Sequence, residues 1–175
     1  MMNVIRATLT GTYEVIGNPM NADCVIGQSF GASEHGPGAA NIHLASFILD
    51  NCQGRPLILQ SEIADAVMGA APVACVVQGK PSTAGGGELD SWRVLEEAAD
   101  YMKQNQFSRP LLVAHAYHVG RVAMQAKRQG LEPIVPPGLP RAFDAKSTQP
   151  WTRNPRSWAA REIPGLAYLK FKGRL

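Results

Sequence analysis

Short apolar segments that alternate with helical patterns limit the fold of this chain more than any other feature. The apolar segments occupy residues 22–30, 55–61, 72–79 and 109–116, and helical patterns occupy 39–50, 62–70, 89–105 and 117–130. Strands that are apolar along their whole length are typical of parallel sheets covered by helices on both faces. We therefore expect an α/β fold, a Rossmann-like three-layer sandwich with a mostly parallel central sheet. A further strand-like run is expected at 131–137.

Length and composition fit one domain over residues 1–175. Of the 175 residues, 45% are hydrophobic and 18% are charged, which is typical of a globular protein. No segment approaches the ~20 apolar residues of a membrane span, and the beginning of the sequence lacks the apolar core of a signal peptide. Cys24, Cys52 and Cys75 lie in apolar surroundings, which favours buried, reduced thiols. We expect a cytoplasmic location and no membrane partner.

Charge is unevenly distributed along the chain. Residues 141–175 carry eight Lys and Arg against two acidic residues, whereas the rest of the chain is net acidic. Basic and aromatic residues alternate in this tail, a pattern also found in proteins that bind single-stranded nucleic acid. We favour the alternative in which Trp151, Trp158, Leu166 and Tyr168 pack a terminal helix and strand onto the sheet. We therefore do not expect a nucleic-acid partner, and a nucleic-acid-binding module is kept as a second alternative function.

Ligands of doubly wound sheets bind beyond the carboxyl ends of the strands, which selects four loops. These loops are residues 27–38, 60–62, 79–90 and 115–121. The glycines of the first loop allow backbone amides to approach an anion, although no dinucleotide or P-loop motif is present. The candidate ligand-binding residues of the first three loops are Gly27, Gln28, Ser29, Ser61, Ser82 and Thr83. Glu62 is either a first-turn acid of a helix or a catalytic group that holds a ligand hydroxyl or a water.

The segment LLVAHAYHVGR is the most informative part of the sequence. It predicts that a buried strand delivers His115 to the carboxyl edge of the sheet and that the next helix turns His118 and Arg121 to the same side. Arg121 offers a planar fork for phosphate or carboxylate, and His118 is a candidate catalytic group that titrates near neutrality. The H-x-x-H spacing has no further recognisable ligand set, so no metal site is expected.

A serine hydrolase is the main alternative. Residues 27–31 read GQSFG, which matches the GxSxG pattern of a nucleophile elbow, and Asp90 and either His115 or His118 follow in the order of a hydrolase triad. An elbow needs a helix directly after the serine, whereas Gly36, Pro37 and Gly38 delay the helix to about residue 39. We therefore rank this interpretation second.

Several of these segments resemble the YdcF/SanA/ElyC-like proteins, the domain of unknown function family 218. The resemblance is carried by LLVAHAYHVGR, by CVIGQSFG, by LILQSE and by the closing segment with Trp158, Arg161-Glu162, Gly165 and Tyr168. It implies a Rossmann-like domain whose cleft is linked to S-adenosylmethionine in one branch and to envelope biogenesis in membrane-anchored branches. It also implies site roles for Ser61, Glu62, His118 and Arg121, and for Ser29 and His115. The third loop departs from the family pattern, because it lacks the expected Asn and Glu.

Together these patterns predict a protein that binds a small anionic, nucleotide-like molecule in a cleft at the strand carboxyl ends. S-adenosylmethionine and phosphorylated compounds are the candidate ligands, and transferase or hydrolase chemistry is compatible with the residues. The sequence does not specify a cofactor, an oligomeric state or a reaction.

Overall fold

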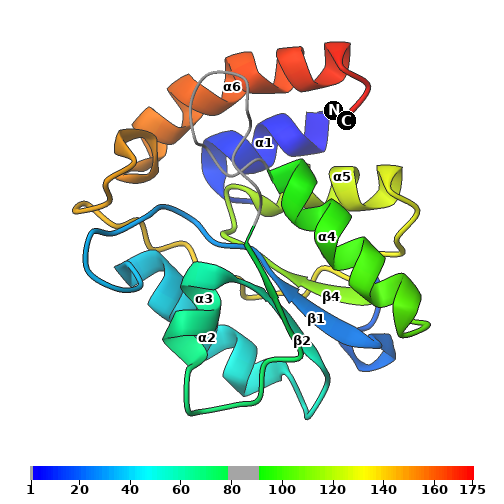
Figure 1. Ribbon diagram of the computed structural model, residues 1–175. Coiled ribbons are helices and arrows are strands. Elements are labelled where there is room, and N and C mark those ends of the chain that lie inside the picture. The colour runs from blue at the N-terminus through cyan, green and yellow to red at the C-terminus, as the bar shows by residue number, and fades with distance from the viewer. Residues whose placement is uncertain (1, 79–90) are drawn as a thin grey trace.

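A parallel four-stranded sheet forms the centre of the protein (Figure 1). The computed structural model describes residues 2–78 and 91–175. The strands lie in the order β3-β2-β1-β4, with bounds β1 Cys24–Gly27, β2 Leu57–Gln60, β3 Cys75–Val77 and β4 Pro110–Val113. Each pair is parallel, and Val25 of β1 lies opposite Leu57 of β2 and Leu111 of β4. The predicted α/β fold with a parallel sheet is confirmed.

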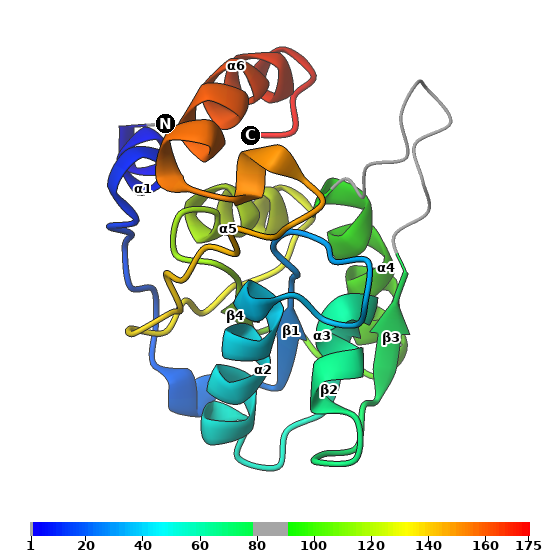
Figure 2. The same cartoon turned by 90° about the vertical axis from the view of Figure 1, so that its left-hand side faces the viewer.

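Helices cover both faces of this sheet, as the uniformly apolar strands predict. Every residue of β1, β2 and β4 is buried, so each of these strands needs a cover on both sides. Figures 1 and 2 show α2 and α3 on one face and α4 and α5 on the other, with α1 and α6 lying beyond α5. The helices are α1 Met2–Thr10, α2 Ala39–Asn51, α3 Ser61–Val67, α4 Ser91–Gln104, α5 Val119–Arg128 and α6 Pro155–Phe171.

The apolar stripes of the helices account for their orientation. In α4 the buried side chains of Val94, Leu95, Ala98 and Met102 recur at helical spacing, as the sequence predicts. Helix α5 ends at Arg128, and Gly130 follows with φ +81°, the left-handed conformation that commonly terminates helices. Helices α4 and α5 pack side by side on one face of the sheet (Figure 1), and both contribute side chains to the candidate site.

Two parts of the chain differ from the sequence-based prediction. Helix α1 was not predicted; Val4, Ala7 and Thr8 form its buried face, but apolar side chains also occupy its exposed face and obscure the periodicity. Residues 131–137 form no strand. Ile134 and Val135 make only isolated bridges, to Leu111 and Ile16 respectively, because Pro133 and Pro136 flank them and restrict further pairing.

The basic tail folds onto the domain as helix α6, preceded by a short 3-10 helix at Pro150–Thr152. Trp158 and Leu166 are buried, in agreement with the packed-tail interpretation, and Trp151 is partly buried. Tyr168 is 59% exposed and no strand follows the helix, so these two details of the prediction are wrong. The reason is that α6 continues to Phe171, which turns Tyr168 away from the core.

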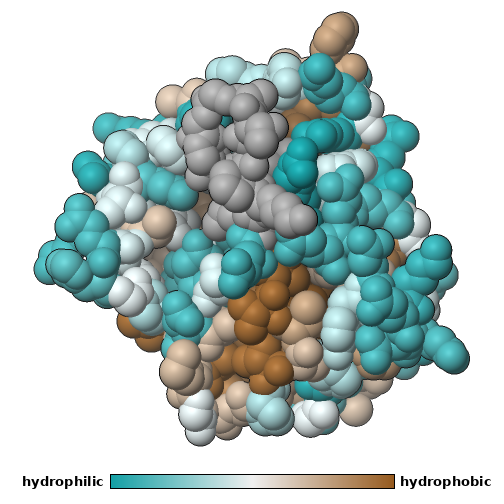
Figure 3. Space-filling view, in the orientation of Figure 1, coloured by the Kyte–Doolittle hydropathy of each residue, from teal (hydrophilic) through white to brown (hydrophobic). Residues whose placement is uncertain are grey.

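The outer strand β3 leaves one edge of the sheet without a partner strand among the described residues. Val76 at its centre is 49% exposed, and Figure 3 shows an apolar patch on this face, below the grey atoms. The strand is only three residues long, which limits the exposed edge. Among the helices of the described residues, none combines the length and the apolar character that crossing a membrane requires.

Candidate functional site

The candidate site lies where β1 and β4 end side by side. From β1 the chain proceeds through α2 to β2 on one side, whereas β4 lies on the other side of β1 and leads into α5. The carboxyl ends of β1 and β4 therefore form a topological switch point, the place where ligands of doubly wound sheets bind. Gln28 continues the pairing of β1 with β4 by one residue, since its backbone N–H donates to the carbonyl of Val113 at the end of β4.

Arg121 is the centre of a buried polar cluster at this switch point. Its Nη2 lies 2.9 Å from Nε2 of His118, and its Nη1 donates to Oγ of Ser91 at 3.1 Å. Its Nε lies 2.6 Å from Oε1 of Glu162, in a geometry that is an ion pair and not a hydrogen bond. The side chains of Arg121 and Glu162 are only 15% and 7% exposed. The predicted proximity of His118 and Arg121 is thus present, and Glu162 and Ser91 join them.

The contact with Arg121 determines the protonation of His118. A guanidinium can only donate, so Nε2 of His118 must be the acceptor. The imidazole is then neutral and carries its proton on Nδ1, which has no hydrogen-bond partner among the described residues. Burial, the charge of Arg121 and the neighbouring His115 all hold the pKa of His118 well below 6.5. The expectation that His118 titrates near neutrality is therefore corrected: it is a neutral hydrogen-bond donor.

His115 lies in an aromatic cluster and not on an accessible wall. Its side chain is fully buried, and its ring stacks on Phe30 with centroids 3.8 Å apart and planes 8° apart. Phe143 contacts the same ring edge-on at 4.7 Å. Burial lowers the pKa of His115 to about 4, although the carbonyl groups of Ala142 and Arg141 act in the opposite direction. Neither ring nitrogen makes a hydrogen bond of good geometry within the described chain, so His115 reaches a ligand only through rearrangement of this cluster.

A second set of buried polar side chains adjoins Arg121 and consists of Ser91, Gln28 and Gln125. Oγ of Ser91 donates to Oε1 of Gln125 at 2.8 Å, and Nε2 of Gln28 donates to the carbonyl of Ser91 at 3.0 Å. Oε1 of Gln28 and Nε2 of Gln125 are buried and have no partner within residues 2–78 and 91–175. Buried polar atoms of this kind are few in folded proteins and point to a water or a ligand. The cluster is therefore polar enough to receive one.

Backbone amides of the glycine-containing loop after β1 donate hydrogen bonds to side chains of the protein. The amide of Ser29 donates to Oε1 of Gln60 at 3.0 Å, and that of Phe30 donates to Oδ1 of Asn41 at 2.8 Å. The amide of Ala32 donates to Oγ of Ser147 at 3.3 Å. These three amides therefore donate to protein acceptors, whereas we expected from the sequence that the amides of this loop would donate to an anion.

Gly27 has a packing role at the end of β1. A Cβ at this position would lie 2.7 Å from Cδ2 of Leu59 and 2.8 Å from Cδ1 of Ile48. The glycine therefore permits α2 and β2 to approach the strand closely, and it is part of the core behind the site.

The remaining predicted residues lie at the edge of the site or outside the described residues. Ser61 and Glu62 open α3, where Oγ of Ser61 donates to Oε2 of Glu62 at 3.2 Å. Both are half-buried, and no hydrogen bond or ion pair joins them to Arg121 or His118. Ser82 and Thr83 fall in 79–90, outside the described residues.

Ser29 gains no catalytic partner among the described residues. Helix α2 begins at Ala39, so no helix follows the serine directly, as an elbow would need. His115 is enclosed by aromatic rings and His118 is engaged by Arg121. Asp90, the third member of the hypothetical triad, lies outside the described residues. The hydrolase interpretation gains no support from this geometry.

Sequence reasoning missed Glu162, Ser91 and Gln125 as members of the site. A signal for Glu162 existed: it lies on the same helical face as Trp158, Leu166 and Leu169, so an acidic residue interrupts an apolar stripe. A carboxylate in such a place is costly unless it is paired. Burial raises the pKa of Glu162, while Arg121 and Arg161 act to lower it.

The buried histidines predict a loss of stability in mild acid. Unfolded histidine binds a proton near pH 6.5, whereas His115 in the folded protein binds it only near pH 4. The stabilisation is complete above about pH 6.5 and falls by about 1.4 kcal/mol per pH unit for each such histidine as the pH decreases. Glu162 acts in the opposite direction, because its raised pKa favours protonation of the folded state.

We expect His115→Phe, which preserves stacking on Phe30, to reduce the slope of the unfolding free energy against pH by the contribution of one histidine. Urea unfolding at a series of pH values measures the slope. His43→Gln, at an exposed position of α2, is the matched control and is expected to leave the slope unchanged. An unaltered slope in His115→Phe would show that His115 is solvated in the folded state.

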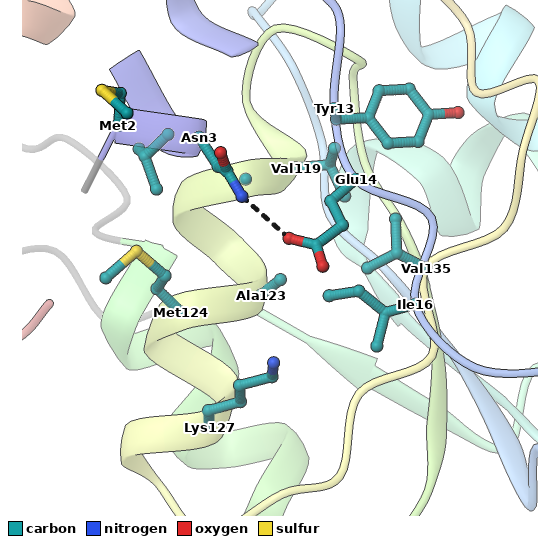
Figure 4. Close-up of a pocket in the computed structure, with 12 residues that line it drawn as sticks. Met2, Asn3, Tyr13, Glu14, Ile16, Val119, Ala123, Met124, Lys127 and Val135 are labelled. Atoms are coloured by element: carbon teal, nitrogen blue, oxygen red, sulfur yellow. Dashed lines mark hydrogen bonds between the residues drawn. The ribbon is translucent and has the colours of Figure 1, made fainter. Parts of the chain in front are cut away.

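A separate cavity of about 300 Å³ lies on the other side of α5 (Figure 4). Val119, Ala123 and Met124 of α5 form one wall, and Ile16 and Val135 form the opposite one. The figure also shows the hydrogen bond of 3.0 Å from Asn3 to Glu14 at its rim. The cavity contains none of the polar cluster around Arg121 and does not extend the candidate site.

The described residues contain no group of three or more His, Cys, Asp or Glu side chains that could hold a metal ion. The three cysteines are free thiols, and Cys24 is buried with its pKa raised to about 12 by desolvation. The family resemblance of the His-Arg segment remains a prediction. Comparison of the chain with protein-family models, with curated proteins and with solved structures found no match.

Proposed function

We propose that this protein binds a small anionic, nucleotide-like or phosphorylated molecule at the switch point between β1 and β4. The observation that carries the proposal is the Nδ1–H of His118, a buried donor without a partner among the described residues, beside the guanidinium of Arg121. Since Nδ1 and Nε2 point to opposite sides of the imidazole ring, the natural acceptors are two separate oxygens of a ligand, one at the Nδ1–H and one at the guanidinium.

The guanidinium retains donors for such a ligand. Among the described residues, its two Nη atoms use one N–H each, toward Ser91 and toward His118, while its Nε forms the ion pair with Glu162. The second N–H group of each Nη atom has no partner within residues 2–78 and 91–175, and a phosphate or carboxylate can accept from such groups in the plane of the fork. Oε1 of Gln28 and Nε2 of Gln125, which have no partner among the described residues, supply an acceptor and a donor for the less charged part of the molecule.

Glu162 limits which anions bind well. Its carboxylate neutralises part of the charge of Arg121, so a doubly charged phosphate has to compete with it. Its raised pKa favours proton uptake when an anion arrives, which would relieve this competition. S-adenosylmethionine, which presents one carboxylate beside a cationic ammonium and a cationic sulfonium, is a second ligand class that the proposal includes.

Any chemistry in this site would be transferase or hydrolase chemistry. In that case we assign His118 the role of a neutral donor that orients the ligand, and we keep Glu62 as a candidate acid or base from the opposite wall. Bound ligand would have to come within reach of α3 for Glu62 to act, because Glu62 contacts Ser61.

The test is a thermal-shift screen of nucleotides, sugar phosphates and S-adenosylmethionine, followed by calorimetry of the best binder. We expect Arg121→Lys to weaken binding at least about tenfold, because the positive charge remains but the planar fork of charge-assisted hydrogen bonds is lost. Arg128→Lys, an exposed position at the end of the same helix, is the matched control. Equal affinity in the two variants, or no binder in the screen, contradicts the proposal.

A further inference from the structure

The outward face of α6 is apolar, although the inward face of this helix is already buried in the core. Trp158, Glu162, Leu166 and Leu169 form the inward face. On the opposite side Ile163, Tyr168 and Phe171 are 41%, 59% and 85% exposed. Pro164 and Ala167 lie between them and are also exposed. Since these positions recur every three or four residues, they form one continuous stripe, the outer stripe of α6.

Basic side chains flank the outer stripe. Arg156 and Lys170 lie on one side of it, and Lys172, just beyond the end of the helix, lies on the other. All three are exposed, and none forms a salt bridge with a carboxylate in the described parts of the chain. The only acidic residue of α6 is Glu162, which is buried on the inward face. The face is therefore apolar in the middle and purely cationic at its margins.

This combination selects the chemistry of the surface that covers it. A second copy of the chain would bring the same cationic margins together, and their repulsion would oppose the contact. Nucleic acid would engage the basic groups, but it would leave the aliphatic part of the stripe in water. A membrane surface with anionic lipids satisfies both: apolar side chains enter the boundary between headgroups and acyl chains, and Lys and Arg reach the lipid phosphates.

We propose that the outer stripe of α6 docks the protein peripherally on an anionic lipid surface. The helix lies in the plane of that surface, with Ile163 and Phe171 inserted and Lys170 and Lys172 at the headgroups. Figures 1 and 2 show α6 on the outside of the molecule, on the side of α5 away from the sheet. The core contacts of the inward face are retained on docking. This proposal differs from the sequence-based expectation of no membrane partner, which rested on the lack of a spanning segment and stays a prediction.

The experiment is co-sedimentation of the full chain with phosphatidylcholine vesicles, with and without phosphatidylserine. Binding is expected only to the vesicles that contain phosphatidylserine, and it should decrease as salt is added. Lys170→Ala with Lys172→Ala is expected to lower the partition coefficient roughly 30-fold, because each basic residue near an anionic surface contributes about fivefold. Phe171→Ser is expected to lower it about tenfold, through the lost apolar insertion.

The matched controls are Lys103→Ala and Met68→Ser, which change exposed residues of the same kinds on α4 and just after α3. They are expected to bind like the unchanged protein. In a second measurement, Tyr168→Trp adds an indole in the stripe to the three natural tryptophans, and its emission, taken as the difference from the unchanged protein, should shift to shorter wavelength with anionic vesicles but not with neutral ones.

Three outcomes overturn the proposal. The first is equal binding to neutral and anionic vesicles, or binding to neither. The second is equal loss of binding in the control and stripe variants. The third is salt-dependent binding of a single-stranded oligonucleotide that depends on Lys170 and Lys172 but not on Phe171, since it would assign the face to nucleic acid.

Discussion

Glu162→Ala is expected to destabilise the folded protein by about 3–5 kcal/mol, because it leaves the guanidinium of Arg121 buried without its carboxylate. The two side chains are 7% and 15% exposed, so water cannot replace the lost charge partner fully. Among the described residues, Arg121 would keep only neutral partners, Ser91 and His118. Unfolding in urea, monitored by circular dichroism, gives the free energy of unfolding directly.

An exposed ion pair supplies the control for this prediction. Arg109 lies 3.1 Å from Asp23, but its side chain is 46% exposed. Arg109→Ala is expected to cost less than about 1 kcal/mol, because a solvated pair contributes little. The double variant Arg121→Met with Glu162→Leu is expected to be more stable than Glu162→Ala, since it leaves no unpaired charge. If the free energy of unfolding of Glu162→Ala lies within about 1 kcal/mol of that of the unchanged protein, water solvates Arg121 and the prediction is wrong.

Phe30→Ala is expected to cost about 3–5 kcal/mol, the range for removing a buried aromatic side chain. Phe30 is 3% exposed and fixes the loop after β1 to the rest of the core. Its ring stacks on His115 and contacts Phe143 at 5.4 Å and Trp158 at 4.8 Å between centroids. Removal of the ring opens a cavity beside all three, so their packing is lost together.

A second readout separates loss of packing from general instability. With Phe30 removed, water can reach His115, and its pKa is expected to rise from about 4 toward its ordinary value. Nuclear magnetic resonance titration of the ring protons measures this change. Phe171→Ala, at a position that is 85% exposed, is the control and should alter the unfolding free energy by less than about 0.5 kcal/mol. A pKa of His115 that stays near 4 in Phe30→Ala would mean that burial by Phe30 is not its cause.

The strands and most helices could be predicted because their signals are local. Each of β1, β2 and β4 is an apolar run, and α4 and α5 have one apolar stripe each. Helix α1 has apolar side chains on both faces, so its hydrophobic periodicity is weak and the sequence did not predict it. The proximity of His118 and Arg121 was also local, since three residues separate them.

The surroundings of the candidate site could not be predicted, because they come from distant segments. Glu162 reaches Arg121 from a helix about forty positions further along the chain, and only tertiary packing brings it there. His115 and His118 look equivalent in the sequence, yet Phe30 and Phe143 enclose the first while Arg121 engages the second. Sequence reasoning therefore treated Arg121 as a free ligand-binding group, whereas the structure gives it a carboxylate partner.

The small apolar cluster between α1 and α6 also has a kinetic consequence. Val4, Leu166, Leu169 and Leu175 form this cluster, which is separate from the main core. Val4 and Leu166 are about 160 positions apart in the chain, so closing this contact first would be entropically expensive. The sheet has to bring the two helices together before they can pack. We therefore expect the contact between α1 and the C-terminal half of α6 to form late and to open first by local unfolding, whereas Trp158 and Glu162 hold the N-terminal half of α6 to the rest of the protein.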